Sequence, residues 1–282
     1  MNFKICLRTE GKPVRDFTLG QYYPVDSVVH RLDARSKILL TIAYIVAVFM
    51  AGNLIAYIPI LAFVLLAARL SKVPGKMLIK GLRPLRILLI FTFVLNLFFG
   101  AGEHILFELG PLTIRDEGLS NAIHFTLRLI FLVSGTSLLT LTTSPVVLTD
   151  GIEMLCSPLR RIGFPAHEMA MMMTIALRFI PTLVEEADKI MKAQSARGAD
   201  FSSGNLKQRA TAMIPLLVPL FISAFRRAGD LAMAMESRCY HGGEGRTRLH
   251  VLRFQKIDFY AFVSVTLLIA AVVLSKNLIN LP

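Results

Sequence analysis

The sequence predicts an all-α polytopic membrane protein with about five transmembrane helices and a cytoplasm-facing module of long helices. First, 54% of its 282 residues are hydrophobic, whereas soluble domains contain about 45–50%. Second, the formal net charge is +12, and the basic residues lie between apolar runs, as in the cytoplasmic loops of membrane proteins. Third, two long stretches have apolar residues at helical spacing. A nucleic-acid-binding protein would carry its basic residues on one solvated face or tail instead.

The polar amino-terminal segment lacks the apolar core of a secretory signal peptide, so we expect no cleavable leader. Asp33 or Ser36 is predicted to cap the helix that follows. Two apolar runs come next, Ile38–Gly52 and Leu54–Leu70, joined at the turn-prone pair Gly52-Asn53. We interpret them as a transmembrane hairpin, because charged residues lie at both outer ends. A single long helix is the alternative.

The stretch from Arg69 to Arg86 contains six basic residues and no acidic residue. The positive-inside rule therefore predicts that this loop is cytoplasmic, and the amino terminus with it. The third span is predicted over Leu85–Ala101 and the fourth over Leu119–Thr142, with a net acidic connection outside. Small and hydroxyl residues from Ser134 to Ser137 would let the fourth span approach its neighbours closely. We interpret Arg128, near the outer end of this span, as an interfacial residue.

After Thr143 the sequence becomes more charged, with fifteen Lys or Arg and ten Asp or Glu up to Lys256. Ile257–Leu274 is the fifth span, which would leave the carboxyl terminus outside. Met169–Val184 and Met213–Phe225 are apolar but interrupted by Arg or Pro, so partial entry into the bilayer as a re-entrant pair is possible for them. The predicted parts are a cytoplasmic or interfacial segment (1–36), four transmembrane helices (37–142), a cytoplasmic module of long helices (143–255) and the last span with its tail (256–282).

Two long helices are predicted in this module. Their apolar residues recur in steps of three and four, which is the period of an amphipathic helix. The positions are Met169, Met173, Ala176, Ile180, Val184, Ala187 and Met191 in the first helix, and Met213, Leu217, Leu220, Ala224, Ala228, Leu231 and Met235 in the second. We interpret these stripes as packing faces in which methionine fills irregular gaps rather than binding a metal.

Each long helix closes on an arginine motif. The first ends with Ala196-Arg197-Gly198 and the second, 41 residues further on, with Ser237-Arg238-Cys239. A single arginine at a helix end is usually a solvated charge that the helix dipole favours. Here two similar endings recur, and small neighbours leave each guanidinium prominent. Because that planar head suits carboxylates and helix-end carbonyls, the pattern predicts two docking sites for a partner.

The sequence contains no motif for hydrolytic chemistry. It has no GxxxxGK[S/T], HExxH or GxSxG pattern, and its Gly-rich stretch His241–Arg246 follows a helix rather than a strand, as a linker does. Cys6, Cys156 and Cys239 are widely spaced and form no CxxC pair. We therefore expect neither a disulfide framework nor a zinc site, and we predict a non-catalytic protein without metal or cofactor.

Four sequence motifs occur in a specific order and spacing. They are Leu19-Gly20-Gln21-Tyr22-x-Pro24-x-Asp26-Ser27 with His30-Arg31-Leu32-Asp33-x-Arg35-x-Lys37; Ala176-Leu177-Arg178-Phe179-Ile180-Pro181 followed by Glu185-Glu186-Ala187; Ala193-Gln194-x-Ala196-Arg197-Gly198; and Ala234-Met235-Glu236-Ser237-Arg238-Cys239-Tyr240. They resemble the transmembrane T component of energy-coupling factor transporters, the EcfT family, and the similarity covers nearly the whole chain.

The resemblance implies a four-part ABC-type importer for vitamins or other micronutrients in the cell membrane. In that family the T component joins two cytoplasmic ABC-type ATPases to a substrate-binding S component. ATP-driven motion then passes through coupling helices and reorients the S component. The residues implied to dock the ATPases are the two arginines and their flanking residues: Arg197, Arg238, Ala196, Gly198, Ser237 and Cys239.

Two departures from the family pattern stand out. Ala34 occupies a position where the family often has Pro, and Ser237 and Cys239 replace the usual Ala and Gly around the second arginine. The added bulk at Cys239 would alter how closely that helix end approaches its ATPase. The resemblance favours a T component that serves several S components, and it does not name the substrate.

A self-contained permease or ion channel is the alternative function. It would require buried ionisable residues inside the spans as a pathway. The four early spans contain almost none, so the coupling function is the preferred hypothesis.

Overall fold

The structure is a computed structural model that describes residues 22–99, 105–109, 112–199, 206–242 and 254–279. The chain divides into two compact units, one of Gly20–Thr174 with His241–Pro282 and the other around Ile175–Tyr240, and each is described by itself. Several predicted features lie outside the described residues. They are the start of the amino-terminal segment up to position 21, the end of the third span at 100–101 and the linker from 243 onward.

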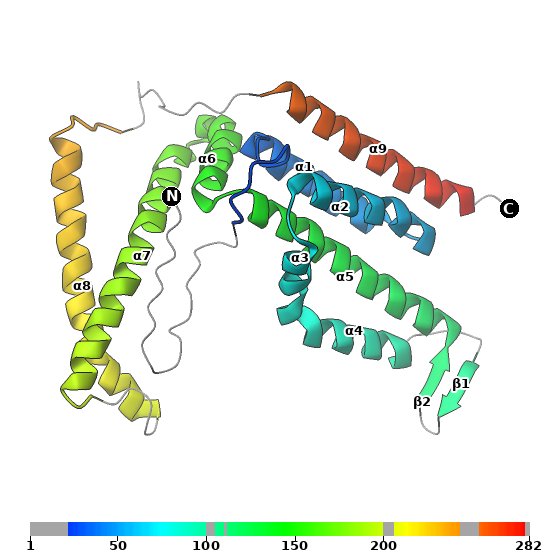
Figure 1. The fold of residues 1–282 in the computed structure, drawn as a ribbon, viewed down its shortest axis with the longest axis horizontal. Helices are drawn as coiled ribbons and strands as arrows, with labels where there is room; N and C mark the ends of the chain where they lie inside the picture. Colours follow the sequence, from blue (N-terminus) through cyan, green and yellow to red (C-terminus); the bar gives the residue numbers. More distant parts are fainter. Residues whose placement is uncertain (1–21, 100–104, 110–111, 200–205, 243–253, 280–282) are drawn as a thin grey trace. The chain divides into compact units, whose positions relative to one another are not determined.

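The larger unit is built from helices. Its helices are α1 (Ala34–Met50), α2 (Tyr57–Ser71), α3 (Gly75–Leu82), α4 (Arg86–Phe99), α5 (Asp116–Thr142), α6 (Pro145–Cys156), the start of α7 (Ala166–Ala196) and α9 (Lys256–Ile279) (Figure 1). Short 3-10 helices precede α2 at Leu54–Ala56, precede α4 at Arg83–Leu85 and follow α6 at Ser157–Ile162. The smaller unit consists of the remainder of α7 together with α8 (Leu206–Glu236).

The predicted class, an all-helical polytopic membrane protein, is confirmed. Among the described residues, four segments are long and apolar enough to cross a bilayer: Leu54–Ser71, Asp116–Thr142, Thr211–Glu236 and Lys256–Ser275. Three of them match predicted spans. The segment Thr211–Glu236 lies in α8, which the sequence predicts to be cytoplasmic or partly re-entrant. The helices of the other two predicted spans, α1 and α4, have 17 and 14 residues. Both are shorter than the roughly 20 residues that usually cross a bilayer.

A two-stranded antiparallel hairpin interrupts the helices before α5. Its strands are β1 (Ile105–Leu109) and β2 (Leu112–Arg115), and Phe107 pairs with Ile114. From the sequence we predict only a net acidic outside loop for this stretch. The signal that predicts a hairpin here is a pair of short apolar runs on either side of the turn dipeptide Gly110-Pro111.

The core of the larger unit lies between α1, α2, α5 and α9. Its buried side chains include Tyr44, Ala47 and Val48 of α1, Tyr57 and Ile60 of α2, Phe131 and Leu138 of α5, and Leu268 and Val272 of α9. The predicted break between the first two spans is present, because α1 ends at Met50 and the following 3-10 helix begins at Leu54. Both helices of the predicted hairpin contribute to the same core.

Arg128 of α5 has a defined structural role. Its guanidinium donates to the carbonyl oxygen of Ala51, the residue that follows the last turn of α1, at 3.2 Å. It also lies within 5.7 Å of the ring centres of Phe49 and Phe125, a distance that allows cation–π attraction. Arg128 therefore caps α1 in addition to any contact with the membrane interface.

The small residues predicted to allow close helix approach do so at Gly135. A Cβ atom at this position would overlap the ring of Tyr44, whose hydroxyl donates to the carbonyl of Phe131 at 2.8 Å. Ser137 makes a second close approach, because a Cβ at Gly81 of α3 would lie 2.9 Å from its Oγ. The spacing of α5 from α1 and α3 thus depends on the absence of side-chain atoms at these glycines.

We expect Gly135→Ala to destabilise the protein by about 1–3 kcal/mol, because the added methyl group must displace the Tyr44 ring from a packed core. Thermal unfolding of the purified chain in detergent measures this loss. Gly229→Ala in α8 is the matched control, since a Cβ there meets no atom within 4 Å. The control should be neutral or slightly stabilising, because alanine is the better helix former. Equal melting temperatures for the two variants would contradict the prediction.

In the smaller unit, α7 and α8 run antiparallel and are joined by an ion pair between Glu186 and Arg227. Their carboxyl-terminal ends lie at opposite ends of the pair (Figure 1). Prolines lie inside both helices, at Pro181 in α7 and at Pro215 and Pro219 in α8, as the sequence indicates.

The interpretation of the apolar stripes as packing faces is wrong for several members, including Met169, Met173, Met213 and Leu217, which are exposed.

Candidate functional site

The chain reverses out of α7 through a Schellman motif at Arg197. The N–H of Ala199 donates to the carbonyl of Gln194 at 3.0 Å. The N–H of Gly198 donates to the carbonyl of Ser195, also at 3.0 Å. These two bonds satisfy the last carbonyls of the helix and require a residue with positive φ after the cap. Gly198 supplies it with φ of +89°, which places Arg197 at the C-cap position.

The end of α8 repeats this geometry around Arg238. The N–H of Tyr240 donates to the carbonyl of Met235 at 3.1 Å. The N–H of Cys239 donates to the carbonyl of Glu236 at 2.9 Å. Here the residue with positive φ is Cys239, at +56°. Arg238 is therefore the C-cap of α8 in the same sense that Arg197 is the C-cap of α7.

The residues of both predicted docking motifs are exposed. They are Ala196, Arg197, Gly198, Ser237, Arg238 and Cys239. The Ser237 hydroxyl donates to the carbonyl of Ala234 at 3.0 Å, so it is turned toward its own helix. The two arginines do not converge on one site, because α7 and α8 end at opposite ends of the pair (Figure 1). Each instead presents an exposed guanidinium, a strong donor to carboxylates and carbonyls, at the end of a helix.

The two helix ends give a reciprocal prediction about glycine. Gly198→Ala should destabilise the end of α7 by about 1–2 kcal/mol, because a residue with a Cβ is strained in the left-handed region. Cys239→Gly should relieve the same strain at the end of α8 and stabilise it by up to about 1 kcal/mol. Hydrogen exchange at the last amides of each helix measures both effects. Shifts of the same sign in the two variants would contradict the prediction.

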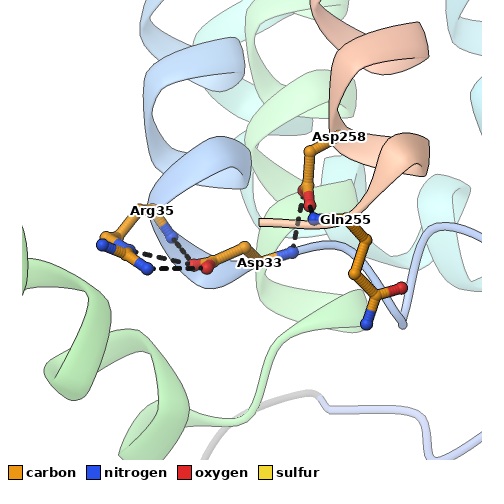
Figure 2. Close-up of polar contacts among 4 residues, drawn as sticks. All are labelled: Asp33, Arg35, Gln255 and Asp258. Atoms are coloured by element: carbon orange, nitrogen blue, oxygen red, sulfur yellow. Dashed lines mark hydrogen bonds and ion pairs between the residues drawn. The ribbon is translucent and has the colours of Figure 1, made fainter. Parts of the chain in front are cut away.

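A polar cluster, which we call the polar cap (Asp33, Arg35, Lys37, Gln255 and Asp258), joins the starts of α1 and α9; Figure 2 shows its members except Lys37. Asp258 is only 1% exposed. Its Oδ1 accepts the N–H of Asp33 at 3.0 Å, and its Oδ2 accepts the N–H of Gln255 at 2.7 Å. A single carboxylate thus caps α9 and fixes the residue before α1.

The rest of the polar cap is equally well satisfied. Asp33 accepts the N–H of Arg35 at 3.0 Å, which confirms the predicted helix cap, and its carboxylate pairs with the Arg35 guanidinium at 3.0 Å. Ser36, the other candidate, lies inside α1. Lys37 is buried and its Nζ donates to the carbonyls of His30 at 3.2 Å and Thr142 at 3.0 Å. The cap therefore connects α1, α5, α9 and the segment before α1.

His30 lies beside the polar cap. Burial lowers the pKa of its imidazole. Nε2 lies 3.0 Å from the carbonyl oxygen of Tyr23, to which it donates, and Nδ1 lies 2.7 Å from the Ser27 hydroxyl. Hydrogen bonds of this imidazole thus hold the segment before α1.

Asp258 is not among the residues predicted from the sequence. An acidic residue in the first turn of a helix is a recognised start signal, and it identifies a cap for α9. Its second partner, Asp33, lies 225 residues earlier, and no local pattern indicates that contact.

The chain is similar to known membrane transport proteins over nearly its full length. Residues 26–249 match a family model described as CbiQ, cobalt transport protein. The chain is 57% identical over 263 residues to the energy-coupling factor transporter transmembrane protein EcfT of Thermosediminibacter oceani, covering 93% of this chain and 99% of that protein. It is 54% identical over 264 residues to the EcfT protein of Clostridium kluyveri, covering 93% and 98%. With the EcfT protein of Bacillus subtilis it shares 46% identity over 252 residues, covering 89% and 95%.

Proposed function

This chain belongs to the EcfT family of energy-coupling factor transporter transmembrane proteins, and from that premise we propose that Arg197 and Arg238 each dock one of two cytoplasmic ABC-type ATPases. It is a non-catalytic, multi-pass membrane subunit of such a transporter. The other partner is a membrane-embedded S component that binds the transported vitamin or micronutrient. ATP hydrolysis takes place in the ATPases, and the helices that end at the two arginines transmit the resulting motion.

The observation that carries this proposal is the repeated C-cap geometry. Each of the two helices ends with the same pattern of two backbone hydrogen bonds, an exposed arginine at the C-cap and a residue of positive φ after it. Two equal helix ends suit two related partner subunits better than a single asymmetric one. The compactness of Ile175–Tyr240 supports a separate coupling module within residues 143–255.

We place the amino terminus and the Arg69–Arg86 stretch in the cytoplasm. The support is the run of six basic residues without an acidic one, because such loops stay on the cytoplasmic side during membrane insertion. This orientation also puts the two arginine motifs on the side where ATP is available.

Exposed apolar side chains on α8 support a membrane-embedded partner. Phe221 and Phe225 are 63% and 72% exposed, and Val218 and Ile222 are exposed beside them. A contiguous apolar surface of this kind is normally covered by lipid or by another protein. We assign it to the S component and the surrounding bilayer.

A channel or self-contained permease is less well supported. Among the described residues, the buried charged side chains are Asp33, Lys37 and Asp258. All three belong to the polar cap, where they bond to backbone groups at or near helix ends. They form a structural joint rather than a series of sites along a span, which an ion pathway would require.

Purification of the intact chain in mild detergent from cells that express the whole transporter tests the proposed function. We expect two ATPase subunits and one small membrane protein to copurify with it, and ATP hydrolysis by the complex to require the ATPases. Identification of the small membrane protein would also reveal the substrate class and whether several S components are served. If no ATPase copurifies, the coupling function is wrong.

A further inference from the structure

The ion pair between Glu186 and Arg227 occupies a special position in the smaller unit. It joins α7 to α8. The two residues are 41 positions apart, which is also the separation between Arg197 and Arg238. When the first arginine motif is superimposed on the second, Glu186 falls on Arg227. Glu186 thus contacts its own equivalent residue.

This coincidence defines an approximate two-fold axis. When two antiparallel helices are related by a two-fold rotation, a residue that contacts its own equivalent must lie at the axis. Arg197 follows Glu186 by eleven residues, and Arg238 follows Arg227 by eleven. At 1.5 Å per residue, each arginine lies about 16 Å from the ion pair along its helix. The prolines of both helices lie before the ion pair, so residues 186–196 and 227–236 are uninterrupted helical arms that lead to the two arginines.

Among the described residues, the groove between the two helices does not fix their register. On one side of the ion pair, α7 and α8 enclose a groove of about 250 Å³ lined mainly by Phe179, Leu183, Ala228 and Leu231. Apolar contacts of this kind are non-directional and tolerate sliding of one helix along the other. A slide of one helical turn would move an arm by about 5.4 Å, enough to remove its arginine from a fixed partner groove.

We propose that Glu186 and Arg227 form a positioning pair that holds the two arms at equal length, so that Arg197 and Arg238 reach a two-fold symmetric pair of ATPases together. The inference rests on the proposed function. Two linked contacts gain affinity only when both can form at once. The pair acts through geometry rather than stability, because the two side chains are 24% and 32% exposed and partly exposed ion pairs contribute little to folding.

The test uses the complete transporter reconstituted in liposomes. The variants are Glu186→Arg, Arg227→Glu and the charge-swapped double variant. Glu185→Arg and Arg226→Glu are matched controls, since these exposed residues have the same types and lie one position earlier in each helix. The first readout is the amount of substrate transported per ATP hydrolysed. The second is the distance between two spin labels at Ala193→Cys and Ala234→Cys, which are equivalent exposed positions on the arms. The labelled protein lacks the native cysteines.

We expect each single reversal at the positioning pair to broaden the label distance distribution and to lower transport per ATP about tenfold, because two like charges would face each other. The swapped pair should restore both readouts, and the two controls should behave like the parent. The inference is overturned if the single reversals leave both readouts unchanged, or if the swapped pair fails to restore them. If the single reversals do not assemble, the swapped pair decides alone. If the reversal variants couple as well as the parent and the parent complex retains its ATPases, only this inference is wrong. If the ATPases do not copurify with the parent chain, the proposed function is wrong.

Discussion

The double substitution Arg197→Glu with Arg238→Glu is expected to abolish ATP-driven uptake while leaving the chain folded in the membrane. Both arginines are exposed and occupy the C-cap positions of their helices. A carboxylate at a helix carboxyl terminus costs only about 0.3–1 kcal/mol through the helix dipole, which the rest of the fold tolerates. Against a partner surface that receives a cation, the same reversal places like charges together and costs several kcal/mol. The loss should therefore appear in coupling and not in stability.

Uptake into proteoliposomes, ATPase copurification and the melting temperature separate these effects. Each single reversal should lower copurification less than the double, because one remaining contact still holds the ATPase pair to the scaffold. Arg178→Glu, an exposed reversal on α7 away from either helix end, should leave all three readouts close to those of the parent. Normal assembly and uptake by the double variant would show that the arginines do not dock the ATPases.

The helix ends were largely predictable because their determinants are local. Arg197 and Gly198 are a cap and its positive-φ residue in direct succession, and a glycine after an apolar helical pattern is a standard end signal. Cys239 adopts the same conformation at φ of +56°, although its side chain disfavours it. Repetition of the motif, rather than residue type, indicated that the second end has the same structure.

The parts that the sequence did not reveal depend on contacts between distant segments. Asp258 bonds to Asp33 across 225 residues, and Glu186 pairs with Arg227 across 41. Each of these charges, considered alone, is typical of an ordinary helix start or a solvated helix face. The number of spans was also uncertain, because hydropathy measures the apolar length of α1 and α8 and does not reveal which partners cover them.

Asp258→Ala is expected to cause the largest loss of stability among single substitutions in the larger unit. The change removes the acceptor for two backbone N–H groups, those of the buried Asp33 and of Gln255. It also removes the negative charge that offsets the buried Lys37. Breaking a buried charged contact on one side typically costs about 3–5 kcal/mol, a large fraction of the stability of a small domain.

Thermal unfolding in detergent compares Asp258→Ala with Asp258→Asn and with Asp26→Ala. Asparagine keeps one acceptor oxygen, so it should retain one of the two bonds and give an intermediate melting temperature. Asp26 is 87% exposed and pairs with Arg31 only at 3.6 Å, so its removal should change stability by less than about 0.5 kcal/mol. A melting temperature of Asp258→Ala equal to that of Asp26→Ala would mean that α1 and α9 are held by their apolar contacts alone. The ordered decrease from Asp26→Ala through Asp258→Asn to Asp258→Ala would identify the polar cap as the joint that fixes the first and last helices of the larger unit to each other.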